Sequence, residues 1–257
     1  MTEVPTPTPI PAAAVRALSL LALLALWVGA AALAGDRLIL PQPWSLGAPL
    51  RDEIAAGRLP WHLARTLVRV LWAFALAMAI GTALGLVMGR RPAIDRWLDP
   101  WLVVFLNLPA LVLIVLCYLW IGLNETAAIV AVTLNKIPGV VTIIREGARA
   151  LDPGLAAMAA VFRMSPGRRL RHVTLPQLAP YVAAAARSGI AVIWKIVLVV
   201  EFLGRSNGIG FQIHLHFQQF DVAMVLVYAL SFVAVMLAVE WLVLQPIEAR
   251  ARRWRGA

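Results

Sequence analysis

The sequence has little charge and few of the residues that bind metals or form disulfides. Only 14% of its 257 residues are charged, and it holds 13 acidic residues, four histidines and one cysteine. A soluble domain carries about 25% charged residues, so the composition excludes an ordinary soluble fold. Because Cys117 is the single cysteine, an intrachain disulfide is excluded, and the scattered histidines do not have the spacing of metal ligands. We interpret Cys117, which lies in an apolar run, as a small buried hydrophobe.

The remaining composition is dominated by long apolar runs, with 61% hydrophobic residues overall. A helix crosses a bilayer in roughly 20 residues, and the period-two alternation of barrel strands is absent. We therefore predict an all-α polytopic membrane protein with about six transmembrane helices, and we see no internal repeat. The expected spans are residues 14–33, 62–88, 101–121, 126–144, 180–203 and 222–244.

The basic residues gather in three places that six spans would put on one side of the membrane. They are Arg90, Arg91 and Arg96, then Arg163, Arg168, Arg169 and Arg171, then Arg250, Arg252, Arg253 and Arg255. The positive-inside rule predicts that this side is cytoplasmic and that both termini lie there. The net charge of +10 is then attributed to topology and phospholipid contact, not to nucleic acid.

The chain is expected to form a short tail and one domain. Residues 1–13 are predicted to be a disordered cytoplasmic tail, and residues 14–257 a single transmembrane domain. Only Arg16 precedes the first apolar run, whereas a signal peptide begins with a basic region and ends at a cleavage site. The first span is therefore expected to stay uncleaved.

The longest inner connection, residues 145–179, has the local signals of a helix. Asp152 and Pro153 suit a helix N-cap and first turn, and an alanine-rich segment follows up to Met164. Residues 165–167 (Ser-Pro-Gly) break that helix, and residues 168–173 are expected to form a second short helical piece. On the outer side, residues 51–59 are expected to form a short amphipathic helix.

This inner loop resembles the cytoplasmic signature of permease subunits of bacterial ATP-binding-cassette (ABC) importers. That signature reads Glu-Ala-Ala, three residues, Gly, and further on a hydrophobic residue and Leu-Pro. Val173 and Leu175-Pro176 match it, whereas Ala157, Met158 and Ala159 occupy the Glu-Ala-Ala positions and Arg163 occupies the glycine position. The match is therefore degenerate at the acid and at the glycine.

Downstream segments resemble the nitrate/sulfonate/taurine group of these importers. They are Trp194-Lys195, Glu201 to Gly204, Asn207 to Phe211, and the C-terminal segment from Pro246 to Trp254. The resemblance covers residues 59–254.

The resemblance implies a non-catalytic subunit of a bacterial inner-membrane importer. Such permeases pair, usually as homodimers, with two ABC ATPase subunits inside and a solute-binding protein outside. The chain contains no Gly-x-x-x-x-Gly-Lys-Ser/Thr phosphate loop, so we expect no cofactor in this chain and ATP and Mg²⁺ on the partner ATPase. The resemblance also implies a small solute, with an anionic sulfonate-, taurine- or nitrate-like one expected. The resemblance further implies that the loop helix at residues 155–162 is a cytoplasmic coupling helix, which sits in a groove of the ATPase. The residues implied to couple to the ATPase are Leu155, Ala157, Met158, Ala159, Phe162, Arg163, Gly167, Leu175 and Pro176.

Arg163, in place of the signature glycine, has two interpretations. It could form a salt bridge to an acidic ATPase surface, or it could be a solvated charge that favours the C-terminal helix dipole. A missing glycine also argues against a sharp turn at this position, in which case residues 165–167 would supply the turn slightly later.

Polar groups inside spans are candidates for the translocation path, because a charge costs about 3 kcal/mol or more at the bilayer centre. The candidates are Asn107, Asn135, Lys136, Lys195 and Glu201. The alternative, which we favour for the lysines, is structural pairing with Glu201 or with carbonyls released by Pro138. Asn107 and Pro109 indicate either a helix break or a packing kink.

Two further features leave alternatives open. Gly81, Gly85 and Gly89 recur on one face of the second span and favour close helix packing, within the subunit more readily than across a dimer. The segment from Gly204 to Phe220, with His214 and His216, would either dip back as an outer gate or form a surface loop that touches the binding protein.

Other classes of function also remain at this point. An ion-coupled secondary transporter would show repeated halves and membrane carboxylates, which this sequence has little of. A membrane assembly protein would not need the helix-turn-Leu-Pro arrangement of the inner loop.

Overall fold

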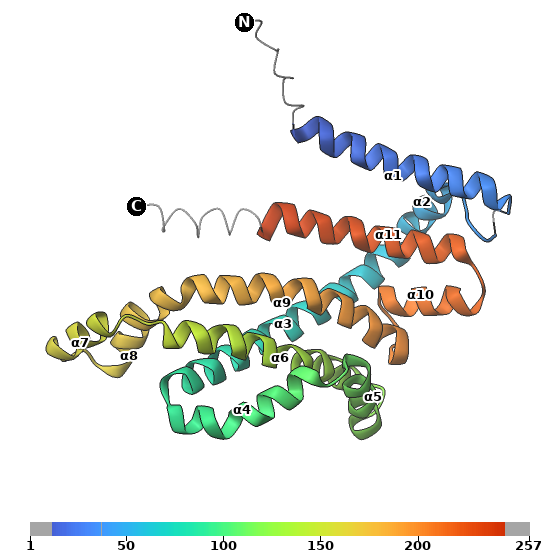
Figure 1. Ribbon diagram of the computed structural model, residues 1–257. Helices are drawn as coiled ribbons and strands as arrows, with labels where there is room; N and C mark the ends of the chain where they lie inside the picture. Colours follow the sequence, from blue (N-terminus) through green and yellow to red (C-terminus); the bar gives the residue numbers. More distant parts are fainter. Residues whose placement is uncertain (1–11, 37, 245–257) are drawn as a thin grey trace, which may run out of the picture.

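The computed structural model describes residues 12–36 and 38–244, and all regular structure in these ranges is helical (Figure 1). Short helical turns at Pro43–Leu46, Leu170–Thr174 and Glu240–Leu244 supplement the main helices. The helices are α1 (Ala12–Ala34), α2 (Gly47–Ala55), α3 (Arg58–Arg90), α4 (Pro92–Asn107), α5 (Ala110–Ile121), α6 (Glu125–Arg149), α7 (Pro153–Val161), α8 (Pro166–Arg169), α9 (Leu175–Gly204), α10 (Ile209–Gln218) and α11 (Val222–Val239).

The predicted number of spans agrees with the structure if one broken pair of helices counts as a span. Five helices are long and apolar enough to cross a membrane, and α4 with α5 makes a sixth candidate bent by 98°. The third predicted span, residues 101–121, is therefore wrong as a single straight helix. Leu108 adopts an extended conformation before Pro109, as the steric clash with a following proline favours. Asn107 and Pro109 therefore mark a helix break and not a packing kink.

The fifth span begins earlier than predicted. Helix runs without interruption from Pro166 to Gly204. A π-helical stretch at Leu170–Thr174 precedes Pro176, and Pro180 is accommodated inside α9. The predicted short helical piece at residues 168–173 is therefore the first part of this long helix. The predicted helix at 51–59 is displaced: α2 ends at Ala55, and Gly57, with φ of +72°, separates it from α3.

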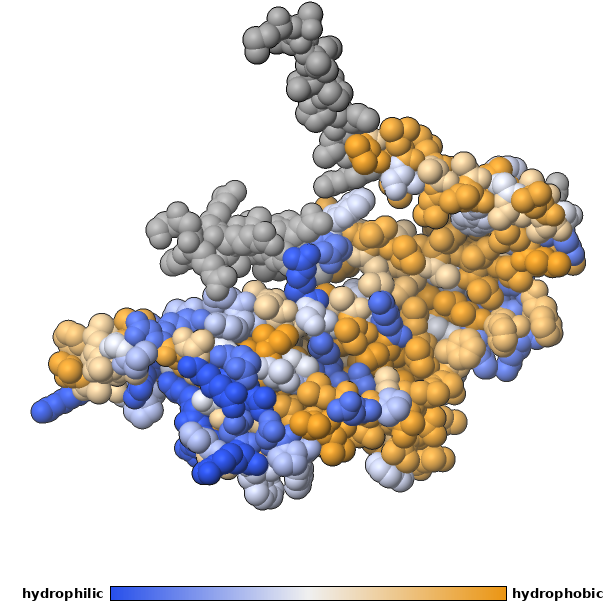
Figure 2. All heavy atoms as spheres, viewed as in Figure 1, coloured by the Kyte–Doolittle hydropathy of each residue, from blue (hydrophilic) through white to orange (hydrophobic). Residues whose placement is uncertain are grey.

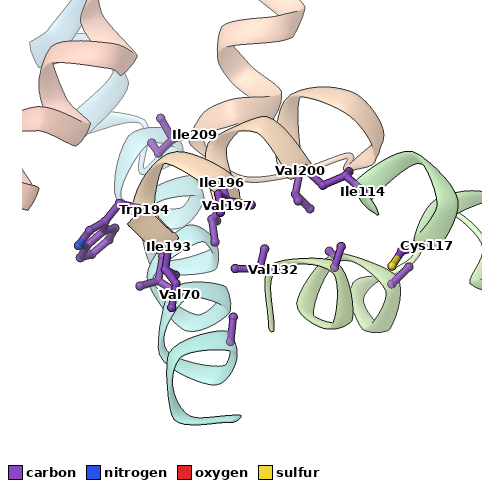
Figure 3. Close-up of a cluster of buried hydrophobic side chains, with 14 of the residues drawn as sticks. Val70, Ile114, Cys117, Val132, Ile193, Trp194, Ile196, Val197, Val200 and Ile209 are labelled. Atoms are coloured by element: carbon purple, nitrogen blue, oxygen red, sulfur yellow. The ribbon is translucent and has the colours of Figure 1, made fainter. Parts of the chain in front are cut away.

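The core lies where α3, α6 and α9 pack together, with α5, α10 and α11 around them. Figure 3 shows Val70, Val132 and Ile193 meeting in this cluster, with Cys117 of α5 among its members. Cys117 is buried and free, as predicted.

The glycine pattern explains how closely α3 approaches α6. A Cβ on Gly85 would lie 2.8 Å from the Ile144 side chain, and one on Gly81 would lie 2.6 Å from Val140. Gly89 faces Ala148 in the same way. The stripe therefore packs two helices of the same chain, as predicted, because the absent side chains let the backbones meet.

The outside of the bundle is apolar, and α1 lies along one side of it (Figures 1 and 2). Most of the leucines of α1 are exposed, and Trp27 reaches back to donate its indole N–H to the Pro41 carbonyl. In Figure 1, α1 starts and α11 ends on the side toward which α7 and α8 project. The predicted tail up to residue 11 and the basic segment from residue 245 onward lie outside the described residues.

Candidate functional site

Helix α7 starts where the local signals place it. Asp152 is the N-cap, and its Oδ1 accepts a hydrogen bond from the Gly154 backbone N–H at 2.7 Å, with Pro153 at the first position. The Asp152 backbone N–H donates to Oε1 of Gln177 at 2.9 Å, and Gln177 is anchored in turn on the Val173 carbonyl. The start of α7 is therefore attached to the start of α9, which leads into the membrane.

Helix α7 ends in a tight turn at Arg163. This residue has φ of +47°, the left-handed conformation that favours glycine, and the Met164 backbone N–H donates back to the Ala159 carbonyl at 3.0 Å. That pattern is a helix C-terminal motif usually built with glycine. The expectation of a later turn at residues 165–167 was therefore wrong, since the chain keeps the sharp turn with an arginine in the glycine position.

The surface of α7 is apolar and open to solvent. Ala159 is 1% exposed and packs inward, whereas Phe162 is 73% exposed and Val161 79%. The other residues predicted for coupling are all exposed: Leu155, Ala157, Met158, Arg163, Gly167, Leu175 and Pro176. Together with Phe162 and Val161 these residues are called the loop patch below. Eight of the nine predicted coupling residues are thus exposed, and Ala159 is buried.

A second polar constellation lies inside the bundle, and sequence reasoning found only part of it. Arg69 of α3 is 1% exposed, and its Nη1 lies 2.5 Å from Oε1 of Glu201, which is fully buried. Its Nε and Nη2 donate to both oxygens of Glu125 at 2.6 and 2.9 Å, and it also bonds Asn207. Arg205 completes this cluster, with Nη2 3.0 Å from Glu125. Arg69 could have been found as a charge inside the second predicted span.

Glu201 also holds the start of α10. The Gly210 backbone N–H donates to Oε2 of Glu201 at 2.8 Å, and Ile209 N–H donates to the Thr66 hydroxyl, which itself donates to Glu201. His62 Nδ1 accepts from the Gly208 N–H at 3.0 Å. These side chains accept hydrogen bonds from the N–H groups at the start of α10, which have no partner within the helix itself. The segment predicted as a gate or surface loop is therefore a helix that packs back on α9 and α11.

The two lysines have different surroundings. Lys136 is 6% exposed, and its Nζ lies 3.4 Å from the Ser188 carbonyl of α9. Lys195 is exposed on α9, and Glu201 is paired with Arg69 and not with either lysine. The predicted pairing of the lysines with Glu201 was therefore wrong, because Arg69 occupies that carboxylate. Asn135 is half-buried, and Asn107 is exposed, with Nδ2 2.8 Å from the Val103 carbonyl.

At the same end of the bundle as α10, Glu53 of α2 ties two spans together. Its carboxylate accepts from Arg58, with Nη2 2.6 Å from Oε1, and from the Tyr228 hydroxyl at 2.6 Å. The Arg58 guanidinium lowers the pKa of Glu53 below its ordinary value, more than burial raises it, and the Tyr228 hydrogen bond acts in the same direction as Arg58. Glu53 is therefore held as a carboxylate although its residue is only 6% exposed.

Comparison with proteins of known sequence points to one kind of membrane subunit. SsuC of Escherichia coli K12, whose name describes an aliphatic sulfonates transport permease, is 31% identical over 85% of this chain and 83% of its own length. The protein of the same name in Bacillus subtilis 168 is 26% identical over 68% of this chain, and the match spans 63% of that relative. The taurine transport permease TauC of E. coli is 26% identical over 76% of this chain and 70% of its own length.

A solved structure shares the fold. The chain superposes on a subunit of the methionine ABC transporter MetNI, in an inward-facing conformation, with a TM-score of 0.58 and 17% identity, over 76% of this chain and 94% of that one. The model of the family described as "Binding-protein-dependent transport system inner membrane component" matches residues 77–245. These residues include α7, its tight turn, α6 and the glycine-bearing last part of α3, and the chain therefore belongs to this family of ABC importer permease subunits.

Proposed function

We propose that two copies of this chain form the translocation path of a bacterial inner-membrane importer for a small anionic solute of the sulfonate, taurine or nitrate type. A separate pair of ABC ATPase subunits binds ATP and Mg²⁺ and docks on the loop patch, and an external solute-binding protein delivers the solute. Both termini are cytoplasmic in this arrangement. The start of α1 and the end of α11 lie toward the α7 end, which supports that orientation (Figure 1).

The observation that carries the docking proposal is the exposed apolar surface of α7. Phe162 and Val161 are more than 70% exposed on a helix that projects from the bundle. Exposed apolar side chains on a helix that projects from the bundle suit a groove of a partner protein that receives a short helix. The Gln177 contact with Asp152 would pass movement of α7 to α9. ATP-driven closure of the ATPases then becomes a rigid-body rearrangement of the spans.

The exposed lysine on α9 supports a path between two copies. Lys195 lies within the membrane-spanning run that ends at Gly204, and it is exposed in the single chain. A lysine facing lipid there costs about 3 kcal/mol or more, so a second copy or a hydrated path would cover it. Lys136 approaches the same helix from α6. Two cations near one path favour an anionic solute, and the names of the sulfonate and taurine relatives agree with that class.

The docking proposal is tested by co-purification of the full-length chain with its ATPase in mild detergent. Phe162→Asp and Ala157→Arg change only exposed positions, so the permease stays folded and the ATPase is lost. Phe220→Asp makes the same kind of change at an 84% exposed residue on the other end of the bundle and keeps the ATPase bound. Retention of the ATPase by both loop variants would refute docking on this patch.

The substrate proposal is tested by uptake into vesicles that contain the whole importer. Taurine, an alkanesulfonate and nitrate are compared with a neutral solute, in the wild type and in Lys195→Ala and Lys136→Ala variants. We expect uptake of one anion and a reduced rate in the Lys195→Ala variant. Unchanged anion uptake in both variants would remove the lysines from the path without affecting the docking proposal.

A further inference from the structure

An open groove of about 570 Å³ lies where the inner ends of α3 and α6 meet α8. Its lining combines small or apolar residues with three arginines: Gly89, Arg90, Ala148, Arg149, Met164, Pro166, Arg169 and Leu170. Helices α3, α6 and α8 thus each contribute one arginine to the lining. Figure 2 shows hydrophilic residues gathered at this end of the molecule, next to the apolar surface of the spans.

The three arginines are not equally neutralised. Arg149 pairs with Asp95 and with Glu146, at 2.5 and 2.9 Å. Arg90 donates to a neutral partner, the Thr174 hydroxyl, at 3.1 Å. The Nε of Arg169 is buried without a hydrogen-bond partner among the described residues. Arg90 and Arg169 have no acidic partner among the ion pairs of the described residues, so the groove carries net positive charge.

The exposed surface of α3 continues from this groove along the membrane. Leu76, Ile80, Leu84 and Val87 are 39–41% exposed. Their spacing of four, four and three residues places them on one helix face, and the same spacing leads on to Arg90. An acyl chain lying along this face would bring its phosphate to the height of Arg90, where the membrane span ends.

We propose that this groove is a binding site for a phosphate group, held by Arg169 and Arg90, and that the group belongs to the headgroup of an anionic phospholipid. Guanidinium groups bind phosphate oxygens through paired charge-assisted hydrogen bonds. Basic pockets between transmembrane helices on the cytoplasmic side suit lipid headgroups. A headgroup here contacts the ends of two spans and the beginning of α8, so it fixes the loop that carries α7 relative to the bundle. The site does not depend on the identity of the transported solute.

Native mass spectrometry of the full-length chain in its purified complex tests this proposal. Phosphatidylglycerol, phosphatidylcholine and inorganic phosphate are titrated separately against the wild type, Arg169→Gln and Arg169→Lys. Loss of charged hydrogen bonds predicts roughly tenfold or greater weakening of phosphatidylglycerol binding in Arg169→Gln. Partial recovery is expected in Arg169→Lys, which keeps the charge. Arg168→Gln removes a neighbouring exposed arginine outside the groove lining and serves as the matched control.

The three titrations separate the possible sources of the phosphate group. If Arg169→Gln selectively loses phosphatidylglycerol binding, the phosphate group belongs to a lipid headgroup. A selective loss of inorganic phosphate, with lipid binding unchanged, supports the phosphate site but overturns its assignment to lipid. Equal behaviour of Arg169→Gln and Arg168→Gln in all three titrations overturns the site. Because Arg169 supports no other residue through its Nε, Arg169→Gln is expected to fold, and its melting temperature without added lipid checks this.

Discussion

Arg69 of α3 and Glu201 of α9 form an ion pair inside the bundle, 132 residues apart in the sequence, with Nη1 2.5 Å from Oε1. The carboxylate also accepts the Gly210 N–H at the start of α10, and the guanidinium also holds Glu125 at the start of α6. Four helices therefore depend on two charges. A buried pair of this kind contributes little when intact but costs much when one member is removed, because the other charge stays behind in a low-dielectric interior.

Replacing Arg69 with methionine should destabilise the protein by about 3–5 kcal/mol, because Glu201 loses its compensating charge. The double variant Arg69→Met, Glu201→Gln should be less destabilised than the sum of the two single variants, since neither then leaves the other uncompensated. Unfolding in detergent measures the stability of the two single variants and of the double variant. Asp52→Asn, which removes an exposed carboxylate of α2, is the control. Additive effects of Arg69→Met and Glu201→Gln would contradict the pair.

Gly85→Val should disrupt the contact between α3 and α6. A Cβ at Gly85 already meets the Ile144 side chain and the Val141 carbonyl at 2.8 Å, so the helices must separate, at a cost of about 1–3 kcal/mol. The melting temperature in detergent gives the readout. Gly29→Val in α1 is the matched control, because a Cβ at Gly29 meets nothing within 4 Å. If both variants melt alike, the glycine stripe does not set this helix distance.

Arg163→Gly should stabilise the turn after α7. Arg163 has φ of +47°, and a left-handed conformation costs a residue with a Cβ about 1 kcal/mol relative to glycine. Arg163→Val should have the opposite effect, since branching at Cβ increases the clash. Hydrogen exchange of the Met164 amide, which bonds the Ala159 carbonyl, reports the local stability. Faster exchange in the glycine variant than in the wild type would contradict this view of the turn.

Protonation of the Glu53 carboxylate should make the protein less stable in acid. Its folded pKa is lowered by Arg58, so the stabilisation is present above the unfolded pKa of about 4.3 and is lost as the pH falls through the lower folded value. Melting temperatures measured from neutral pH downward should therefore fall more steeply in the wild type than in Glu53→Gln. Asp52→Asn should follow the wild type. An identical acid profile for Glu53→Gln and the wild type would show that the carboxylate is not held in its charged form.

The sequence by itself determined the class of protein, the number of spans and the place of the loop helix. Each of these rests on information that is local in the chain. Hydropathy over about 20 residues identifies a span, and the Asp152-Pro153 pair marks the start of α7 through its own cap geometry. The packing face of Gly81, Gly85 and Gly89 was also visible, because helical spacing alone puts them on one side.

Only the tertiary structure decided which charges meet and how the short helices turn back. In apolar spans both packed and lipid-facing positions are hydrophobic, so the pattern does not reveal which helix faces Arg69 or Glu201. The Arg69–Glu201 pair, the return of α10 onto α9 and the groove of Arg90, Arg149 and Arg169 each join segments far apart in the sequence. The left-handed turn at Arg163 was missed because the usual glycine signal is absent. Backbone hydrogen bonds from Arg163 to Ala160 and from Met164 to Ala159 close the turn instead.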